Sequence, residues 1–187
     1  MGNTESAPRR KSKPEFRGAG CVFTNGDTVL AGYQKKKGDI VISGLGGSRE
    51  EGESYMDTAL RETIEELFDV KEVPPKCIET LKKVLKPISV RGKEVEDWGM
   101  YITVVYTFEQ LETLLKYVEK ARIKSPLYDT FPKTVSDLLL ERNGDKGSSP
   151  AEIAYLTIIP SDSDYAKSPI QPEFLDDMRA IHKKYNH

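Results

Sequence analysis

Residues Ser54–Leu67 constrain the fold most, because they read as one uninterrupted amphipathic helix. The segment contains no glycine or proline, and Ser54 is a favoured N-cap residue. At about 100° per residue, one side of this helix collects the apolar and small residues. They are Met56, Leu60, Thr63, Ile64 and Leu67. Such a face has to pack against another layer, so the rest of the chain must supply one.

Strand and turn signals surround this helix. Asn25-Gly26 lies between two apolar runs and predicts a hairpin. Residues 40–42 predict a further strand, and the glycines of 44–47 predict a flexible loop. The turn residues Arg91-Gly92-Lys93 favour a second hairpin, which leads into a β-forming stretch over 98–108.

Later segments alternate between helical and strand patterns. Residues 77–90 are ambiguous between a helix and a strand. Helical periodicity begins at Glu109, and 109–142 is predicted to be a helical insertion. Residues 153–159 read as a buried strand, and residues from about 172 to 184 read as a final helix. This order of elements predicts an α+β fold in which helices pack on a mixed β-sheet.

The composition fits a water-soluble globular domain. The chain has 187 residues, of which 37% are hydrophobic and 31% charged, and its net charge is −2. That charge argues against a generally basic nucleic-acid-binding protein. The two cysteines, Cys21 and Cys77, make no disulfide framework, which is typical of an intracellular, cytoplasmic protein. No apolar run is long enough to span a bilayer.

The N-terminus carries a separate signal. Residues 1–16 are predicted to be a disordered tail, and 17–187 form the domain. Gly2 together with Ser6 matches the N-myristoylation pattern, and basic residues follow within 9–13. One myristoyl chain binds membrane weakly, so these charges would complete a peripheral membrane attachment. The alternative is a polar leader without lipid, and mass spectrometry after expression with an N-myristoyltransferase distinguishes the two.

Three glutamates lie on the polar face of the helix. Glu62, Glu65 and Glu66 are spaced i, i+3 and i+4, and like charges at this spacing weaken a helix by roughly a few tenths of a kcal/mol per pair. A solvated acidic surface is the usual interpretation of such a face. The alternative is a Mg²⁺ site, because this ion prefers oxygen ligands. The glycine-rich stretch 44–47 favours the metal site, since it can present backbone groups to a ligand.

The spacing around these glutamates resembles the signature of the Nudix hydrolases. Gly47 is followed after five residues by Glu53, and seven residues later by Arg61-Glu62-Thr63-Ile64-Glu65-Glu66. The family signature is Gly-x5-Glu-x7-Arg-Glu-U-x-Glu-Glu-x-Gly-U, where U is a bulky aliphatic residue. The resemblance covers residues 47–69 and implies a Nudix-type α/β/α sandwich with a mixed β-sheet.

The chain departs from this signature at three positions. Thr63 and Asp69 stand where aliphatic residues are usual, and Phe68 replaces the glycine that ends the helix. Ser48 stands where many family members have a basic residue. These changes concern the end of the helix more than the glutamates.

The resemblance implies a metal-dependent pyrophosphohydrolase that cleaves a diphosphate linkage in a nucleoside diphosphate-X type substrate. In that case Glu62, Glu65 and Glu66 ligate Mg²⁺ or Mn²⁺, with the Gly46 carbonyl as a further ligand. The metal would neutralise the diphosphate and lower the pKa of the attacking water.

Two further roles follow from the same resemblance. Arg61 and Glu53 would brace the loop against the helix. The general base varies within the family, so Glu65 and Glu152 are both candidates. Glu152 precedes the last strand, and its alternative is an ordinary exposed acid.

Substrate contacts are predicted at Gly46, Gly47, Lys35 and Trp98. Lys35 belongs to a basic run that would attract phosphates, and Trp98 and Tyr101 would stack on a base. The alternative for Lys35 is a solvated basic loop, and the alternative for the aromatic residues is a place in a core strand. The glycine loop resembles that of members acting on nucleoside triphosphates. Capped RNA and a diphosphoinositol polyphosphate are alternative substrates, and RNA is expected only as a substrate.

A non-enzymatic hypothesis is a Nudix-fold binding or scaffold protein at a membrane. The retained Glu62, Glu65 and Glu66 argue against it, because a scaffold has no need of three mutually repelling acids. The segment 109–142 would serve as a lid, as a homodimer element or as core packing.

Overall fold

The structure, a computed structural model, describes residues 15–36, 38–146, 152–162 and 169–185. The predicted lipid site at Gly2 and the basic residues 9–13 lie outside these residues. The elements follow in the order β1 (Phe16–Thr24), β2 (Thr28–Lys36), β3 (Asp39–Ser43), β4 (Leu45–Ser48), α1 (Tyr55–Phe68), α2 (Pro75–Val84), β5 (Ser89–Val95), β6 (Gly99–Thr107), α3 (Phe108–Lys120), α4 (Val135–Leu140), the 3-10 helix η1 (Gly144–Lys146), β7 (Tyr155–Pro160) and α5 (Pro172–Tyr185).

The strands form one mixed sheet. Its main path runs β3-β2-β1-β6-β5, and β4 and β7 join it by pairing with β1 and β2. The central pair, β1 and β6, is parallel, from Phe16 opposite Met100 to Thr24 opposite Thr107. The other pairs are antiparallel, including the hairpin predicted at Asn25-Gly26.

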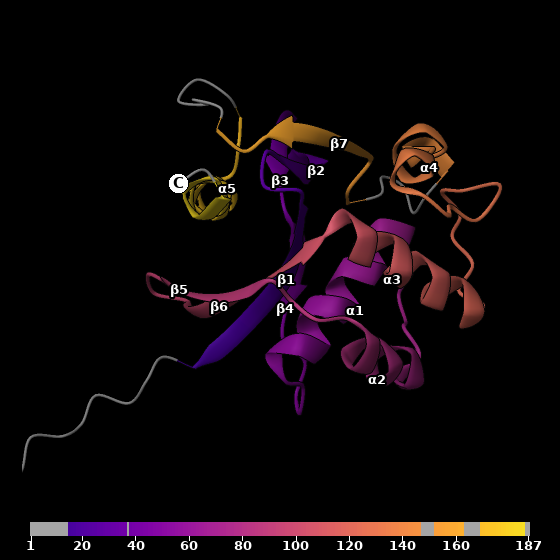
Figure 1. The fold of residues 1–187 in the computed structure, drawn as a ribbon, viewed down its shortest axis with the longest axis horizontal. Coiled ribbons are helices and arrows are strands. Elements are labelled where there is room, and N and C mark those ends of the chain that lie inside the picture. The colour runs from indigo at the N-terminus through magenta and orange to yellow at the C-terminus, as the bar shows by residue number, and fades with distance from the viewer. Residues whose placement is uncertain (1–14, 37, 147–151, 163–168, 186–187) are drawn as a thin grey trace, which may run out of the picture.

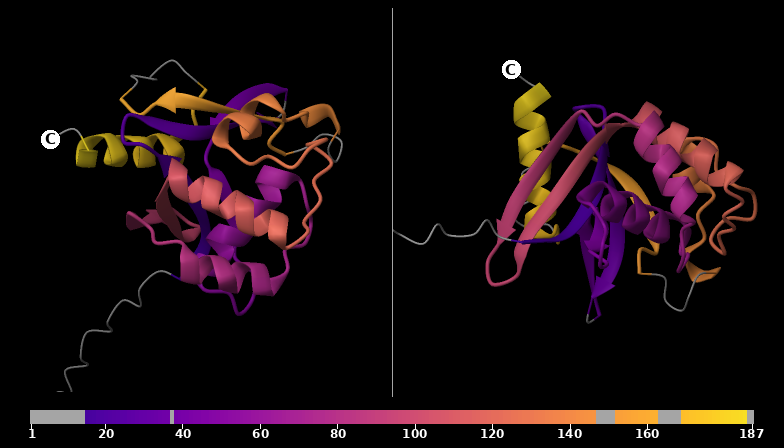
Figure 2. Two further views of the ribbon diagram at one scale, coloured as in Figure 1. Left: turned by 45° about the vertical axis from the view of Figure 1, so that its right-hand side comes forward. Right: turned by 90° about the horizontal axis from the view of Figure 1, so that it is seen from below.

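Helices cover both faces of this sheet, with α1 to α4 on one side and α5 on the other (Figures 1 and 2). Consecutive residues of β1 serve the two faces, because side chains alternate along a strand. Phe23 belongs to the larger buried cluster, together with Leu60 and Leu114 of the helices. Val22 belongs to the smaller cluster, together with Phe174 of α5. The molecule is therefore an α/β/α sandwich.

Helix α1 begins where its sequence predicts. The Ser54 Oγ accepts from the Asp57 N–H at 3.2 Å, and the Asp57 carboxylate accepts from the Ser54 N–H at 2.9 Å. This reciprocal capping box satisfies two backbone donors at the helix start. Leu60, Ile64 and Leu67 are fully buried. Each such side chain contributes about 1.5–3 kcal/mol on burial, so the apolar face holds α1 on the sheet.

The end of α1 accommodates two of the three departures from the family signature, Phe68 and Asp69. Asp69 adopts the left-handed conformation usual for glycine at this place, with φ 50° and ψ 51°. Phe68 is fully buried and stacks on Phe131, with 5.1 Å between ring centroids. The helix therefore ends cleanly at Phe68, without the glycine.

We expect Asp69→Val to lower the free energy of unfolding by about 1–2 kcal/mol, because a β-branched residue is strained at positive φ. Asp69→Asn is the control, since asparagine tolerates this conformation. Urea unfolding of the three proteins measures the difference. Equal stability of the valine and asparagine variants would contradict the expectation.

The prediction of a flexible loop at 44–47 was wrong. Residues Leu45–Ser48 form β4, which pairs with β1 from Cys21 to Gly18. A Cβ at Gly20 would lie 2.0 Å from the Leu45 carbonyl oxygen, so the two strands approach closely only because this residue is glycine. Glycine weakens a strand on its own, and the pairing partner is remote in sequence.

Two strand predictions also needed correction. Arg91-Gly92-Lys93 is not a turn but lies inside β5, and the chain turns at 96–98, where Asp97 has φ 59°. The predicted buried strand is β7, which pairs with β2 and leaves Tyr155 and Ile158 exposed. The ambiguous residues 77–90 divide between α2 and β5.

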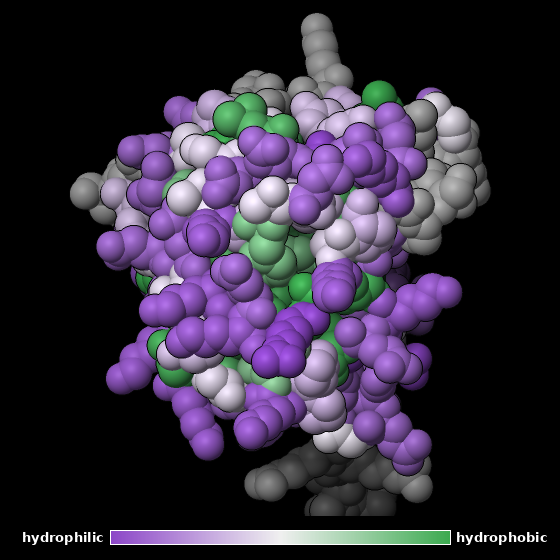
Figure 3. Space-filling model, turned by 90° about the vertical axis from the view of Figure 1, so that its right-hand side faces the viewer, coloured by the Kyte–Doolittle hydropathy of each residue, from purple (hydrophilic) through white to green (hydrophobic). Residues whose placement is uncertain are grey.

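The segment 109–142 contains α3 and α4. Leu111, Leu114 and Leu115 are fully buried in the larger cluster, which supports the core-packing role among the three considered. The outer face of this side of the molecule is mostly hydrophilic, with a central strip of apolar residues (Figure 3). Within the described ranges, no helix combines the length and apolar character needed to cross a membrane.

Candidate active site

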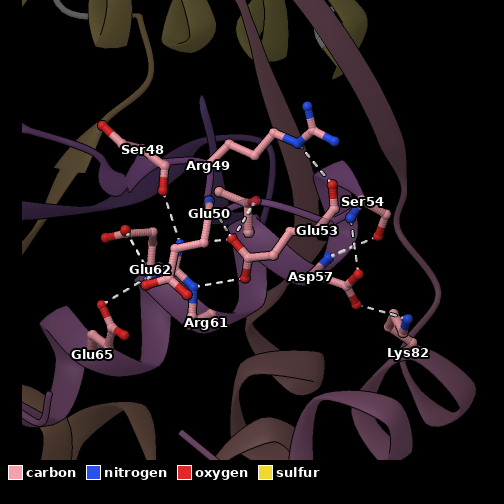
Figure 4. Close-up of polar contacts among 11 residues, drawn as sticks. Ser48, Arg49, Glu50, Glu53, Ser54, Asp57, Arg61, Glu62, Glu65 and Lys82 are labelled. Atoms are coloured by element: carbon pink, nitrogen blue, oxygen red, sulfur yellow. Dashed lines mark hydrogen bonds and ion pairs between the residues drawn. The ribbon is translucent and has the colours of Figure 1, made fainter. Parts of the chain in front are cut away.

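Arg61, in the middle of α1, is the centre of an ion-pair network that reaches the residues before the helix (Figure 4). Its Nε and Nη2 donate to the two carboxylate oxygens of Glu53 at 2.7 and 2.9 Å, and Nη2 also donates to the Ser48 carbonyl at 2.8 Å. Burial opposes ionisation of Glu53, but the bonds from Arg61, the Glu50 N–H and Thr58 lower its pKa below the ordinary value. The network ties the end of β4 to α1.

Glu62 and Glu65 turn toward this same guanidinium. Arg61 Nη1 donates to Glu62 at 2.8 Å and to Glu65 at 3.2 Å. Burial raises the pKa of both carboxyls, and Arg61 offsets this only in part. The Glu62 carboxylate also lies against Gly47, where an added Cβ would be 2.3 Å from an oxygen. Gly47 therefore leaves the room that Glu62 needs.

Glu66 contacts the neighbouring glycine. The Gly46 N–H donates to Glu66 Oε2 at 2.9 Å. In an antiparallel strand, the N–H and C=O of one residue point to the same side of the strand. The Gly46 carbonyl therefore points to the side of β4 on which the Glu66 carboxylate lies. Burial raises the pKa of Glu66 well above its ordinary value, and the charges of Glu152 and Glu62 add to the rise.

A cleft of about 310 Å³ opens beside Glu66 and crosses to α5. Gly46, Gly47, Glu66 and Glu152 line one end, and the Glu152 carboxylate accepts from Gln34 Nε2 at 2.9 Å. Thr103, Gln171, Glu173, Phe174 and Asp177 line the part of the cleft toward α5. Trp98 and Tyr101 also line the cleft but lie beside β4, because a Cβ added at Gly46 would be 2.0 Å from the Tyr101 hydroxyl and one added at Gly18 would be 2.7 Å from Trp98. Among the described lining residues are four carboxylates and no lysine, arginine or histidine. Every charged side chain among the described lining residues is thus acidic.

The part of the cleft toward α5 is held together by bonds between β5, β6 and α5. Asp177 is buried, and its carboxylate accepts from Thr103 at 2.8 Å and from Arg91 at 3.3 Å. Burial raises the pKa of Asp177, and these partners offset the rise only in part. Trp98 and Tyr101 form a tilted aromatic pair, with 6.4 Å between ring centroids.

The structure groups the predicted site residues in three sets. Gly46, Gly47, Glu66, Glu152 and Trp98 line the cleft, whereas Glu62, Glu65, Glu53 and Arg61 form the network beside it. Lys35 lies in β2 opposite Ile40, and its side chain is outside the described part. Tyr101, considered with Trp98 as a stacking residue, also lines the cleft, whereas Thr103 and Asp177 were not predicted, because a strand or helix residue facing a cleft has no local signal in the sequence.

The glutamates suit a hard divalent cation by their chemistry. All the candidate donors are oxygens, which Mg²⁺ and Mn²⁺ prefer. Burial disfavours the charged forms of Glu62, Glu65 and Glu66, and a bound cation would stabilise those charged forms. In the described structure no three acidic, histidine or cysteine side chains are already arranged around a metal position. Glu62 and Glu65 would exchange Arg61 contacts for metal contacts.

The raised pKa of Glu66 predicts a pH-dependent stability. A carboxyl whose pKa is raised by folding stabilises the folded state at low pH, and this contribution is lost as pH rises through the raised pKa. Glutamine does not ionise, so Glu66→Gln does not lose stability as the pH rises. In chelator at pH 8, this variant should therefore unfold at a higher temperature than the wild type. The difference should vanish below the ordinary carboxyl pKa of about 4.3. An exposed-site control, Glu119→Gln, should show neither effect, and a less stable Glu66→Gln at pH 8 would refute the expectation.

Comparisons with known proteins identify similar folds. No protein-family model and no curated protein matches the sequence. A bifunctional NMN adenylyltransferase/ADP ribose pyrophosphatase from Francisella tularensis, complexed with AMP and a Mn ion, is similar at 10% identity and a TM-score of 0.50, over 95% of this chain and 43% of that one. A NUDIX hydrolase from Nitrosomonas europaea is similar at 15% identity and a TM-score of 0.48, over 92% and 91%. A Nudix hydrolase from M. smegmatis is similar at 17% identity and a TM-score of 0.44, over 89% and 84%.

These likenesses concern the fold. This chain spans less than half the length of the bifunctional Francisella tularensis protein, with which it shares its fold. Together with the mixed sheet and its two helical layers, the likeness to the Francisella tularensis protein confirms the predicted α+β fold.

Proposed function

We propose that this chain, which has a Nudix-type fold, is a metal-dependent hydrolase that cleaves a diphosphate linkage in a nucleotide-type substrate. The observation that carries the proposal is the arrangement around β4. Arg61 and Glu53 fix the end of this strand to α1, so that Gly46 and Glu66 together face the acidic cleft.

The charge of the cleft explains the need for a metal. A diphosphate carries several negative charges, and the described lining offers carboxylates but no cationic side chain. Glu62, Glu65, Glu66 and the Gly46 carbonyl would hold Mg²⁺ or Mn²⁺. Once bound, the metal neutralises the phosphates and lowers the pKa of water. The negative charge of the ionisable side chains that line the cleft thus supports metal dependence.

Glu152 is the better-supported candidate for the general base. It lines the cleft beside Glu66, and its bond to Gln34 leaves one carboxylate oxygen for a water. Glu65 does not line the cleft and contacts Arg61 instead. A base must lie within hydrogen-bond reach of the proton that it takes, so position favours Glu152.

The lining of the cleft supports a nucleotide over a diphosphoinositol polyphosphate. Trp98 and Phe174 offer apolar surface for a planar base, and Asp177 offers acceptors for its N–H groups. A densely phosphorylated inositol would meet acids here instead of lysines and arginines. The cleft volume of about 310 Å³ lies within the range of small-molecule sites.

A substrate panel with Mg²⁺, Mn²⁺ or chelator tests the proposal. It contains nucleoside triphosphates, nucleotide sugars, dinucleoside polyphosphates, capped RNA and diphosphoinositol phosphates. We expect metal-dependent release of phosphate or pyrophosphate from a nucleotide member. Turnover of the diphosphoinositol phosphates alone would refute the substrate class. The absence of turnover on every member would refute the hydrolase and favour the binding or scaffold hypothesis.

Trp98 provides a test of base binding. We expect Trp98→Ala to raise KM about tenfold with a smaller effect on kcat, because base–aromatic stacking contributes about 1–3 kcal/mol. Trp98→Phe retains a stacking surface and should stay near the wild type. Steady-state kinetics on the best nucleotide of the panel measures both constants, and an unchanged KM in Trp98→Ala would rule out the stacking role.

A further inference from the structure

Arg142 is a buried cation far along the chain from the glutamate helix. The residue is 5% exposed and follows α4. On one side it donates to the carbonyls of Glu66, at 2.9 Å, and Leu67 at the end of α1. On the other side it donates to the carbonyls of Ile153, at 2.6 Å, and Ala154, at 3.2 Å. One guanidinium therefore joins two segments of the backbone.

The chemistry of this contact requires an arginine. The described acceptors of Arg142 are these carbonyls and the Tyr128 hydroxyl, at 3.0 Å, so its partners are neutral. A buried cation without a carboxylate is costly unless its donors are satisfied. The planar fork of arginine presents five N–H groups in fixed directions, whereas lysine has a single nitrogen. Lysine at this position would keep the positive charge but could not donate to both backbone segments at once.

The end of α1 shows why such a partner is needed. The last turn of α1 contains no basic residue, and Asp69 replaces the local glycine. Carbonyls at a helix C-terminus lack partners within the helix and favour a nearby cation. Arg142 donates to two of them, so it supplies from a distant segment what the helix lacks locally.

The other two carbonyls belong to the residues directly after Glu152. Glu152 and Glu66 line the same end of the cleft, and Arg142 contacts the backbone of Glu66 itself. We propose that Arg142 is a positioning residue, which clamps residues 153–154 to the end of α1 and so holds Glu152 beside Glu66. The proposal rests on the proposed function, in which Glu152 takes a proton from the attacking water.

The clamp also gives the segment 109–142 a role at the site. Tyr128 accepts from Arg142 and donates to the Leu138 carbonyl at 2.9 Å. Phe131 stacks on Phe68 at the end of α1. The segment thus holds the Arg142 side chain through Tyr128 and keeps its guanidinium between the end of α1 and residues 153–154.

Kinetics of Arg142→Lys test the positioning role. We expect kcat to fall about 10- to 100-fold, because small displacements of a catalytic group have effects of this size. KM should stay within about twofold, since Arg142 does not line the cleft. The control is Lys146→Met, which breaks a nearby exposed ion pair with Asp129 at 2.8 Å and should leave both constants unchanged. An unchanged kcat in Arg142→Lys would overturn the proposal.

A double-mutant cycle shows whether Arg142 acts through Glu152. Glu152→Gln should lower kcat strongly in the wild type and much less in Arg142→Lys, because the base is already displaced there. The loss in the double variant should therefore be smaller than the product of the single losses. Losses that multiply would show that Arg142 acts independently of Glu152 and would overturn the proposal.

Hydrogen exchange tests the clamp without any activity. In Arg142→Lys, amides of 152–156 and of the last turn of α1 should exchange at least tenfold faster, while those of β1 and β6 stay unchanged. Uniform acceleration would indicate general destabilisation and overturn the clamp. If the wild type hydrolyses no panel member, the proposed function fails while this measurement still decides the clamp. If Arg142→Lys does not fold, Tyr128→Phe replaces it, because this variant removes one acceptor of Arg142. The same amides should then exchange about threefold faster.

Discussion

Glu66→Gln is expected to abolish metal-dependent hydrolysis, with a fall in kcat of at least about 10³-fold. Glutamine has nearly the shape of glutamate and can still accept from the Gly46 N–H, so the fold around β4 should persist. What it loses is the negative charge that would hold the metal opposite the diphosphate. Steady-state kinetics at saturating Mg²⁺ measures the fall.

Three comparisons make this result specific. Glu65→Gln should be equally inactive if both acids hold the metal, whereas the exposed Glu119→Gln should retain full activity. Added Mg²⁺ should raise the unfolding temperature of the wild type and have little effect on Glu66→Gln, because a ligand stabilises only the state that binds it. Unchanged turnover in both site variants would remove these glutamates from the metal site.

Arg61→Met is expected to lower the free energy of unfolding by about 3–5 kcal/mol, the usual result of removing one partner from a buried ion-pair network. The side chain is 10% exposed, and its removal leaves Glu53, Glu62 and Glu65 without their common cation. It also frees the Ser48 carbonyl, so β4 loses a link to α1. Urea unfolding at pH 7 in chelator measures the change.

Lys82→Met is the matched control for this prediction. Lys82 pairs with Asp57 and Glu79 at 2.7 Å, but in a more exposed position, so its loss should change stability by at most about 1 kcal/mol. Arg61→Lys should fall between the two, because lysine keeps the charge without the two-pronged bond to Glu53. A loss below about 1 kcal/mol in Arg61→Met would show that the network adds little to folding.

Local patterns predicted the elements whose cause is local. The Ser54 cap and the apolar spacing of Leu60, Ile64 and Leu67 lie within one helix, so α1 begins at the predicted cap and buries the predicted face. The hairpin at Asn25-Gly26 likewise depends on its own turn. Segments whose partners are distant were predicted less well. β4 pairs with β1 at glycines that by themselves suggest a loop, and Gly92 lies opposite Ile102 inside a strand.

The candidate site divides in the same way. Spacing along one helix placed Glu62, Glu65 and Glu66 together, and the family signature added Gly47, Glu53 and Arg61. Spacing did not show that Arg61 draws Glu62 and Glu65 toward itself, leaving Glu66 at the cleft. The direction of a carboxylate depends on the nearest donor, and the nearest donor is known only after packing.

The sequence by itself therefore determined the glutamate helix, its glycine-rich approach and the kind of chemistry that they suit. The tertiary structure alone decided which residues share the cleft. Glu152 and Asp177 come from segments remote from α1, and Arg142 reaches the end of that helix across more than 70 positions of the chain. The physical reason is that hydrogen bonds and periodicity within a helix act between near neighbours, whereas a cleft forms where distant segments pack.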